Sequence, residues 1–133
     1  LTLYFANKAG DKLVGQRVAM EYNSNISLEK LIVEQLIAGP PFDGAYPTIP
    51  SETKLLNISI KDNICYVNLD EGFLGTGYNV IESIPVYSIV NSLIENTDAQ
   101  KVQISINGET NRMFRESINF DTIFEKNEGL IEQ

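Results

Sequence analysis

The chain has 133 residues, of which 43% are hydrophobic and 21% are charged. This length suits one domain with a real core, and the composition is typical of a folded domain, not a disordered segment. Ten Lys and Arg against eighteen Asp and Glu give a net charge of −8. Such a charge disfavours binding to nucleic acid or to an anionic membrane surface, because both repel acidic proteins.

The residue types also exclude several site chemistries. The chain has no His and a single Cys, Cys65. Ser-His-Asp and Cys-His nucleophiles, most zinc sites and an internal disulfide are therefore excluded. No apolar run approaches the roughly 18 residues that span a bilayer. Leu1 opens directly into strand-like sequence, without a signal peptide, so we expect a domain excised from a longer chain, with any membrane anchor upstream.

The N-terminal third predicts two strands and a helix. Residues 1–6 and 13–22 are strand-like and have a short turn between them, which favours a hairpin. Ser27 is a suitable N-cap, and Gly39 followed by two prolines ends a helix over 28–38. The apolar residues of that segment recur at helical spacing, at Leu28, Leu31, Ile32 and Leu36.

Residues 39–54 hold four of the five prolines and two glycines. A loop of this length is often functional, although it can also be an irregular segment packed on the core through Phe42, Tyr46 and Ile49. Its aromatic residues Phe42 and Tyr46 are candidate contacts for a ligand or partner. Four tyrosines of the chain, Tyr46, Tyr66, Tyr78 and Tyr87, either form a sugar-stacking or protein-binding face or serve as core and scattered surface residues.

The clearest hairpin follows. Residues 55–60 and 64–69 alternate between apolar and polar side chains across a turn at 61–63. We expect one strand to direct Leu56, Ile58 and Ile60 to a common face, and the other to direct Cys65, Val67 and Leu69. Cys65 is then a small core residue.

A Gly-bearing loop over 70–82 leads to a second helix over 84–96, with Ser83 as its cap. Residues 101–106 predict a further strand. The tail is expected to pack back on the domain through Phe114, Ile118, Phe120, Ile123 and Phe124. The order of elements predicts an α+β fold, a two-layer sandwich of a small mixed sheet with two helices packed on one face.

Candidate chemistry is sparse. Gly72, Gly75 and Gly77 follow a strand, but their spacing is not that of a phosphate-binding loop. Asp70 and Glu71 are the best paired carboxylates, although exposed acidic residues in a loop are the simpler interpretation. The calcium-loop pattern is absent. We therefore expect no catalytic residues, metal or cofactor, and a candidate ligand or partner loop formed by Phe42, Tyr46, Asp70 and Glu71.

Five phrases in order resemble motifs of the GerMN domain, the sporulation and spore germination family. They lie at 33–40 (VEQLIAGP), 49–56 (IPSETKLL), 62–70 (DNICYVNLD), 88–93 (SIVNSL) and 102–109 (VQISINGE). Glu52 stands where the family often has Gly. The resemblance implies a ring-building-motif-like fold and one GerMN-like domain over 1–133, with a core over about 1–110 and a C-terminal extension over 111–133.

The resemblance also implies a location. Members occur outside the cytoplasmic membrane, mostly in lipoproteins or anchored proteins, and no catalytic residues are established for them. We therefore expect an extracytoplasmic, non-enzymatic assembly or scaffold domain, tied to the membrane only through an anchor absent from this chain. Its partners would be envelope proteins or like domains. Two alternatives remain open, a peptidoglycan-binding module and a carboxylate-based hydrolase that uses Asp70, Glu71 or Glu109.

Overall fold

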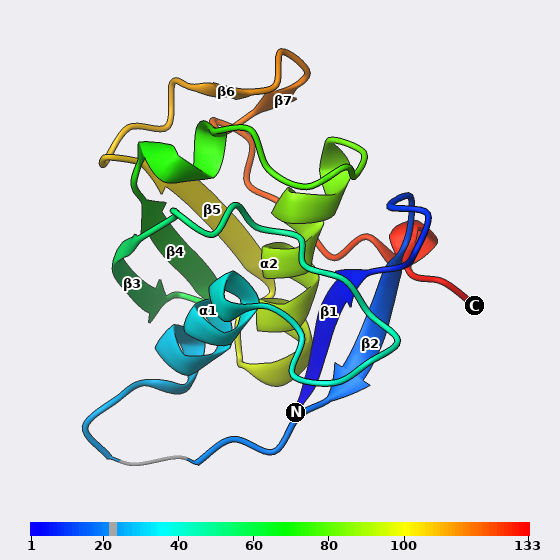
Figure 1. The fold of residues 1–133 in the computed structure, drawn as a ribbon. Helices are drawn as coiled ribbons and strands as arrows, with labels where there is room; N and C mark the ends of the chain where they lie inside the picture. The colour runs from blue at the N-terminus through cyan, green and yellow to red at the C-terminus, as the bar shows by residue number, and fades with distance from the viewer. Residues whose placement is uncertain (22–23) are drawn as a thin grey trace.

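The computed structural model describes residues 1–21 and 24–133. Its strands and helices follow the predicted order closely, and short strands and 3₁₀ turns complete the loops (Figure 1). The elements are β1 (Thr2–Ala6), β2 (Leu13–Arg17), α1 (Leu28–Ala38), β3 (Leu55–Lys61), β4 (Ile64–Leu69), η1 (Glu71–Leu74), α2 (Ser83–Asn96), β5 (Lys101–Ile106), β6 (Met113–Phe114), β7 (Ile118–Asn119) and η2 (Glu128–Leu130).

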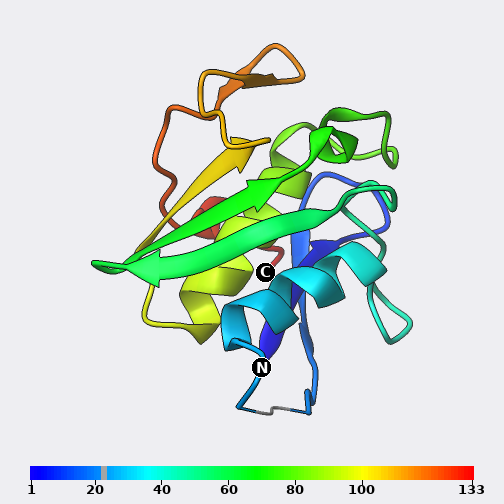
Figure 2. The same cartoon turned by 90° about the vertical axis from the view of Figure 1, so that its left-hand side faces the viewer.

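The central sheet has the order β3-β4-β5 and is mixed. β3 runs antiparallel to β4, and β4 runs parallel to β5, with α2 in the crossover between them. Both helices contact this sheet, α1 at β3 and α2 at β5 (Figures 1 and 2). The sheet turns a fully apolar face towards them, made of Cys65, Val67, Leu69, Val102, Ile104 and Ile106, all buried. The α+β architecture of two helices on a small mixed sheet is thus confirmed.

The first hairpin is a separate two-stranded sheet that lies on the other side of α2 (Figure 1). The strand predicted over 13–22 is too long, because β2 ends at Arg17. Thr2 of β1 is paired with Arg17, and beyond that pair Leu1 and Val18 still hydrogen-bond to each other through their backbones. The end of the predicted strand, Tyr22, lies outside the described residues.

The second edge of β1 is hydrogen-bonded by side chains of α2 instead of by a strand. The Tyr4 N–H donates to Ser92 Oγ at 2.9 Å, and the Ser88 hydroxyl donates to the Tyr4 carbonyl at 2.6 Å. One turn further along α2, the Asn96 side chain accepts from the Thr2 N–H and donates to the Thr2 carbonyl. Because Ser88 and Ser92 are fully buried, these bonds satisfy backbone groups that water cannot reach.

The C-terminal residues pack on the core, as predicted for the aromatic ones. The rings of Phe73, Phe114 and Phe120 form a cluster with centroids 5.1 to 6.2 Å apart, and Phe124 contacts Tyr87. The prediction is wrong for Ile123, which is 41% exposed in a loop between two buried rings.

Polar contacts fix the same segment to α2. The buried Asn91 donates to the Asn127 carbonyl and accepts from the Asn127 N–H. Lys126 Nζ lies 2.8 Å from Glu95 Oε1, and this contact lowers the pKa of the Glu95 carboxyl below its usual range. The Tyr4 hydroxyl donates to the same carboxylate, and burial is the main cause of the raised pKa of Tyr4.

Two local expectations are corrected. The register of β3 shifts between Leu55 and Asn57, so Leu55, Ile58 and Ile60 pack against the core while Leu56 is 48% exposed. Ser83 is the first residue of α2 and not its cap. The cap is Glu82, whose side chain makes no hydrogen bond to the helix.

Replacing Ser92 should show how much the bond to β1 contributes. In Ser92→Ala the Tyr4 N–H stays buried without its acceptor, so we expect a loss of about 1–3 kcal/mol in the free energy of unfolding, measured by urea denaturation. Ser59→Ala, at an exposed serine of β3, is the control and should change stability by less than about 0.5 kcal/mol. Equal effects of the two substitutions would contradict this role of Ser92.

Cys65 should be inert in the folded protein. It is fully buried, and burial is the main cause that raises the pKa of its thiol to about 12, with Glu29 adding to it. From the reference value of 9.0 this leaves a thiolate fraction about a thousandfold smaller. A thiol reagent at mildly alkaline pH should therefore label the chain only after unfolding in guanidinium chloride. Fast labelling of the folded protein would show that β4 opens readily.

Candidate binding site at two adjoining loops

The proline loop (residues 39–54) and the glycine loop (residues 70–80) lie against each other. A Cβ atom at Gly72 would lie 2.7 Å from the Glu52 carbonyl oxygen, and one at Gly77 would lie 3.0 Å from Pro50 Cγ. A Cβ atom does not fit at the first distance and is tightly crowded at the second, so Gly72 permits the close approach of the two backbones and Gly77 makes room for the Pro50 ring. The glycines that resembled a phosphate loop therefore have a packing role here.

Asp70 holds the junction of these two loops. Its Oδ1 accepts from the Lys54 N–H at 2.9 Å and from the Gly72 N–H at 3.1 Å, which caps η1. Its own N–H donates to the Lys54 carbonyl. The carboxylate is thus already bound to backbone donors.

The other candidate carboxylates are joined through one cation. Arg112 lies 3.3 Å from Glu71 and 3.7 Å from Glu109, and both carboxylates are mostly exposed. Glu71 and Asp70 do not line a common hollow with Phe42 and Tyr46 in the part of the chain that the structure describes. The structure thus does not gather the four predicted site residues into one site, and the arrangement gives no positive evidence of catalysis.

The aromatic residues of the proline loop have exposed rings on a fixed backbone. Phe42 is 57% exposed and Tyr46 is 45% exposed. The Gln16 side-chain amide donates to the Phe42 and Asp43 carbonyls, and Tyr46 makes two backbone hydrogen bonds with Ala6. Ile49 is buried and fixes the loop to the core as predicted, whereas Phe42 does not.

Two of the four tyrosines come together. Tyr46 of the proline loop and Tyr78 of the glycine loop line a hollow of about 170 Å³, with Asn79 beside them. Tyr66 lies elsewhere, on β4, where it is 38% exposed, and Tyr87 packs edge-on against Phe124. The tyrosine hollow, as we call it, thus joins the two loops.

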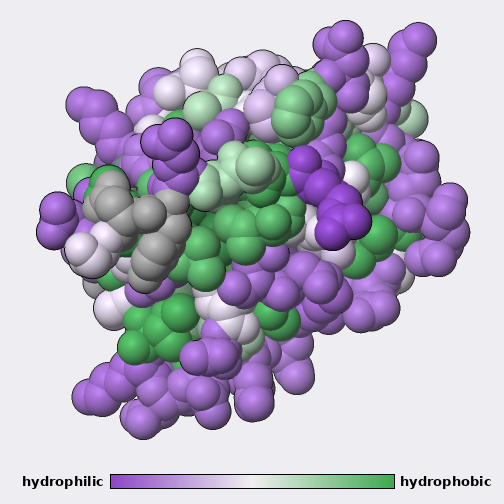
Figure 3. Space-filling view, turned by 90° about the horizontal axis from the view of Figure 1, so that it is seen from below, coloured by the Kyte–Doolittle hydropathy of each residue, from purple (hydrophilic) through white to green (hydrophobic). Residues whose placement is uncertain are grey.

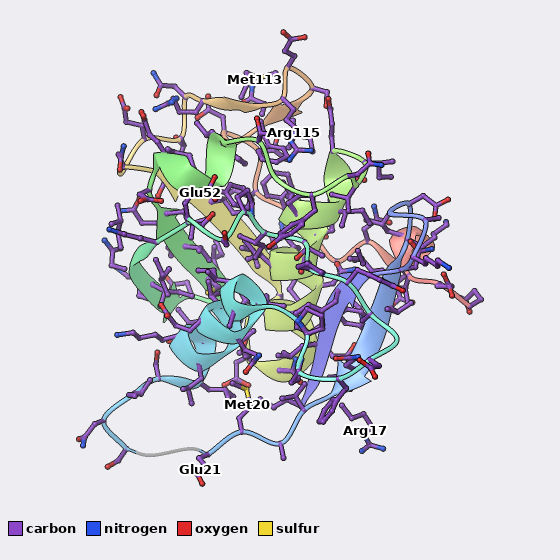
Figure 4. All side chains as sticks on the ribbon, viewed as in Figure 1. Arg17, Met20, Glu21, Glu52, Met113 and Arg115 are labelled. Carbon is purple, nitrogen blue, oxygen red and sulfur yellow. The ribbon has the colours of Figure 1, made fainter. Side chains whose placement is uncertain are left out.

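A second hollow shares Tyr78 with the tyrosine hollow. It has a volume of about 310 Å³, and residues 74–78 line it together with Arg115. Arg115 belongs to the turn between β6 and β7, below that hairpin in Figure 4. Sequence reasoning missed this arginine, because a hairpin turn nearly forty positions further along the chain carries no local sign of its contact with the glycine loop. We call this space the arginine hollow.

The remaining features of the described residues concern metal-binding groups, membrane-spanning helices and the apolar surface. Among residues 1–21 and 24–133, no group of three His, Cys, Asp or Glu side chains is arranged to hold a metal ion, and neither α-helix is long and apolar enough to cross a membrane. Seen from below, the molecule carries an apolar area surrounded by hydrophilic side chains (Figure 3).

The fold is similar to three solved structures. The tandem GerMN domains of the sporulation protein GerM from Bacillus subtilis match with a TM-score of 0.74 and 18% identity, over 100% of this chain and 47% of theirs. The first GerMN domain of the same protein matches with a TM-score of 0.70 and 22% identity, over 89% of this chain and 90% of that one. A candidate lipoprotein from Clostridium perfringens matches with a TM-score of 0.67 and 23% identity, over 95% and 86%.

This chain therefore spans about half the length of the tandem structure. Identities of this size establish the shared fold and nothing further. The comparison with curated proteins gave no match. The model of the family described as Germane, sporulation and spore germination, matches residues 2–112, which is most of the chain. The chain therefore belongs to the sporulation and spore germination family of GerMN domains.

Proposed function

We propose that residues 1–133 act as one non-enzymatic assembly domain at the outer face of the bacterial cytoplasmic membrane, in sporulation or germination. The domain would bind an envelope protein or a like domain through the outer edge of β3. The similarity to tandem GerMN domains supports contacts between like domains, and the candidate lipoprotein among the similar structures supports membrane anchoring.

The outer edge of β3 is the observation that carries this proposal. β3 is the end strand of its sheet and pairs only with β4 among the described strands. Its second row of backbone N–H and C=O groups is therefore available to an added strand. Beside it lies a hollow of about 280 Å³ between β3 and the start of α1, lined in part by Ser27, Lys30 and the exposed Leu56. An extended segment on β3 could place an apolar side chain there.

Charge indicates the kind of segment that fits. Lys54 and Lys61 lie at the two ends of β3, and Lys30 lies beside the hollow, all three exposed. Two copies paired antiparallel through β3 would bring Lys54 of each near Lys61 of the other, and like charges opposite each other are unfavourable. The edge therefore favours an acidic extended segment of another protein or domain, and disfavours self-pairing.

A photo-crosslinking residue at Leu56 tests this contact in the full-length protein in the source cells. We expect one defined envelope partner to be crosslinked from Leu56. The same residue at Tyr66, exposed on the strand next to β3, is the control and should give no such product. Leu56→Asp should weaken binding of the identified partner at least about tenfold, because the charge faces an apolar contact and repels an acidic segment.

Two results would contradict the proposal. One is crosslinking that is equal from both positions, and the other is partner binding that Leu56→Asp leaves unchanged. The location is tested separately. An extracytoplasmic protein should be digested by protease added to cells whose wall has been removed, while a cytoplasmic marker stays intact.

The tyrosine hollow favours a second candidate function, binding of peptidoglycan. Exposed aromatic rings next to amide groups are suited to stacking on sugar rings and hydrogen bonding to them. Tyr46 and Tyr78 supply the rings and Asn79 the amide, from two loops that hold each other in place.

Co-sedimentation with purified peptidoglycan tests this second function. The double variant Tyr46→Ala, Tyr78→Ala should lower the bound fraction at least about fivefold, since it removes both stacking surfaces. Tyr66→Ala is the control, because it removes a ring of similar exposure outside the hollow. Failure of the unsubstituted chain to sediment with the wall would exclude the function.

A further inference from the structure

We infer that the arginine hollow binds the terminal carboxylate of a short peptide, with Arg115 as the group that holds it. This site is separate from the edge of β3 and shares only Tyr78 with the tyrosine hollow. Its defining group, Arg115, belongs to neither function proposed above.

The backbone presents Arg115 in an unusual conformation. The turn between β6 and β7 has positive φ angles at Arg115 (51°) and at Glu116 (74°). This left-handed region costs about 1–2 kcal/mol for each residue other than glycine, and it persists where neighbouring contacts fix the chain. Here the Ser117 hydroxyl donates to the Glu82 carboxylate, and Phe114 is fully buried next to the turn. The hairpin is thus fixed on one side to Glu82, the cap of α2, and on the other by the packing of Phe114 on Phe73 of η1.

The guanidinium of Arg115 has hydrogen-bond donors to spare. It lies over the Phe114 ring, 4.8 Å from the centroid. Within residues 1–21 and 24–133 it has no ion pair and no hydrogen bond, whereas Arg112 and Lys126 each contact two carboxylates. In the part of the chain that the structure describes, Arg112, Arg115 and Lys126 are the half-buried cations, and of these three Arg115 lacks a carboxylate partner. Its donors are available to a ligand in the hollow that it lines.

The backbone of the glycine loop lies close to this guanidinium. A Cβ atom at Gly77 would lie 3.3 Å from Arg115 Nη2, so glycine allows the guanidinium to lie close to the loop backbone. The N–H groups of Thr76 and Gly77 donate no hydrogen bond within the described part of the chain. A guanidinium beside unpaired backbone N–H groups is suited to an anion.

Size and charge point to a carboxylate. The hollow of about 310 Å³ is large enough for a carboxylate with a terminal residue attached, and Leu74 and Tyr78 offer apolar contact to a small side chain. Arg binds carboxylates through two parallel N–H···O bonds. A phosphate, with nearly two charges, would be repelled more strongly by Glu52, whose Oε1 lies 2.9 Å from the Cβ position of Gly75.

Titration calorimetry and NMR chemical shifts with N-acetyl-alanyl-alanine test the site. The free acid should bind, and the C-terminal amide should bind at least about tenfold more weakly, because it lacks the charge that the guanidinium holds. The L,L and D,D peptides are compared as separate arms. Preference for D,D points to a stem peptide of the wall as the source, and preference for L,L points to a protein C-terminus. Either preference supports the site.

Substitutions that remove a positive and a negative charge should have opposite effects on binding, which makes the test specific. Arg115→Gln should abolish the difference between acid and amide, and Glu52→Gln should strengthen binding of the acid at low salt. Arg17→Gln is the matched control, since Arg17 is exposed on β2 at the far end of the molecule (Figure 4). If Arg115→Gln lowers the melting temperature, Arg115→Lys keeps the charge over the Phe114 ring and should bind the acid with intermediate affinity.

Three results would overturn the inference. They are equal binding of acid and amide, no binding of either peptide at millimolar concentration, and identical behaviour of Arg115→Gln and Arg17→Gln.

Discussion

The fold depends on one set of hydrogen bonds. Along the edge of β1 that faces away from β2, side chains of α2 bind the backbone groups that a neighbouring strand would otherwise bind. A helix packed on a strand ordinarily leaves that strand's edge to water or to another strand. Here Ser88, Ser92 and Asn96 accept from and donate to the backbone of β1, so the helix can be buried between the hairpin and the central sheet. Ser88 and Ser92 of the SIVNSL phrase therefore satisfy the backbone of β1, while Asn91 of the same phrase bonds to the backbone of Asn127.

This arrangement places the two loops. α2 begins at Ser83, shortly after the glycine loop, and Ser88 also accepts a hydrogen bond from Thr48 of the proline loop, at 2.9 Å. The helix that hydrogen-bonds β1 thus also holds the proline loop. Asp70 fixes the glycine loop to the C-terminal end of the proline loop, at Lys54. Loops fixed in this way keep their exposed rings in place, which lowers the entropy lost when a ligand binds.

The sequence predicted what depends on local periodicity. The helix over 28–38 and the strand over 64–69 agree residue by residue with α1 and β4, because their apolar spacing matches the face they bury. The exposed Leu56 was not predictable, since a bulge leaves no local sign in an alternating strand. The separate place of the first hairpin was not predictable either, because it follows from polar side chains of α2 that read as ordinary surface residues.

The candidate site divides in the same way. Phe42 and Tyr46 were found from the composition of one loop, but only the chain's path in space shows that Tyr78 faces Tyr46 and that Asp70 is already bound to backbone donors. Arg115 belongs to a segment past the end of the family match at residue 112.

The residues after 112 determine where an expressed fragment of this domain can end. An expression clone that stops at the family boundary would remove the rings of Phe114, Phe120 and Phe124, all buried, and would leave Asn91 without Asn127. Such a fragment would expose the apolar face of Phe73 to solvent and would aggregate or stay unfolded, so the unit that folds extends beyond the unit that sequence families describe.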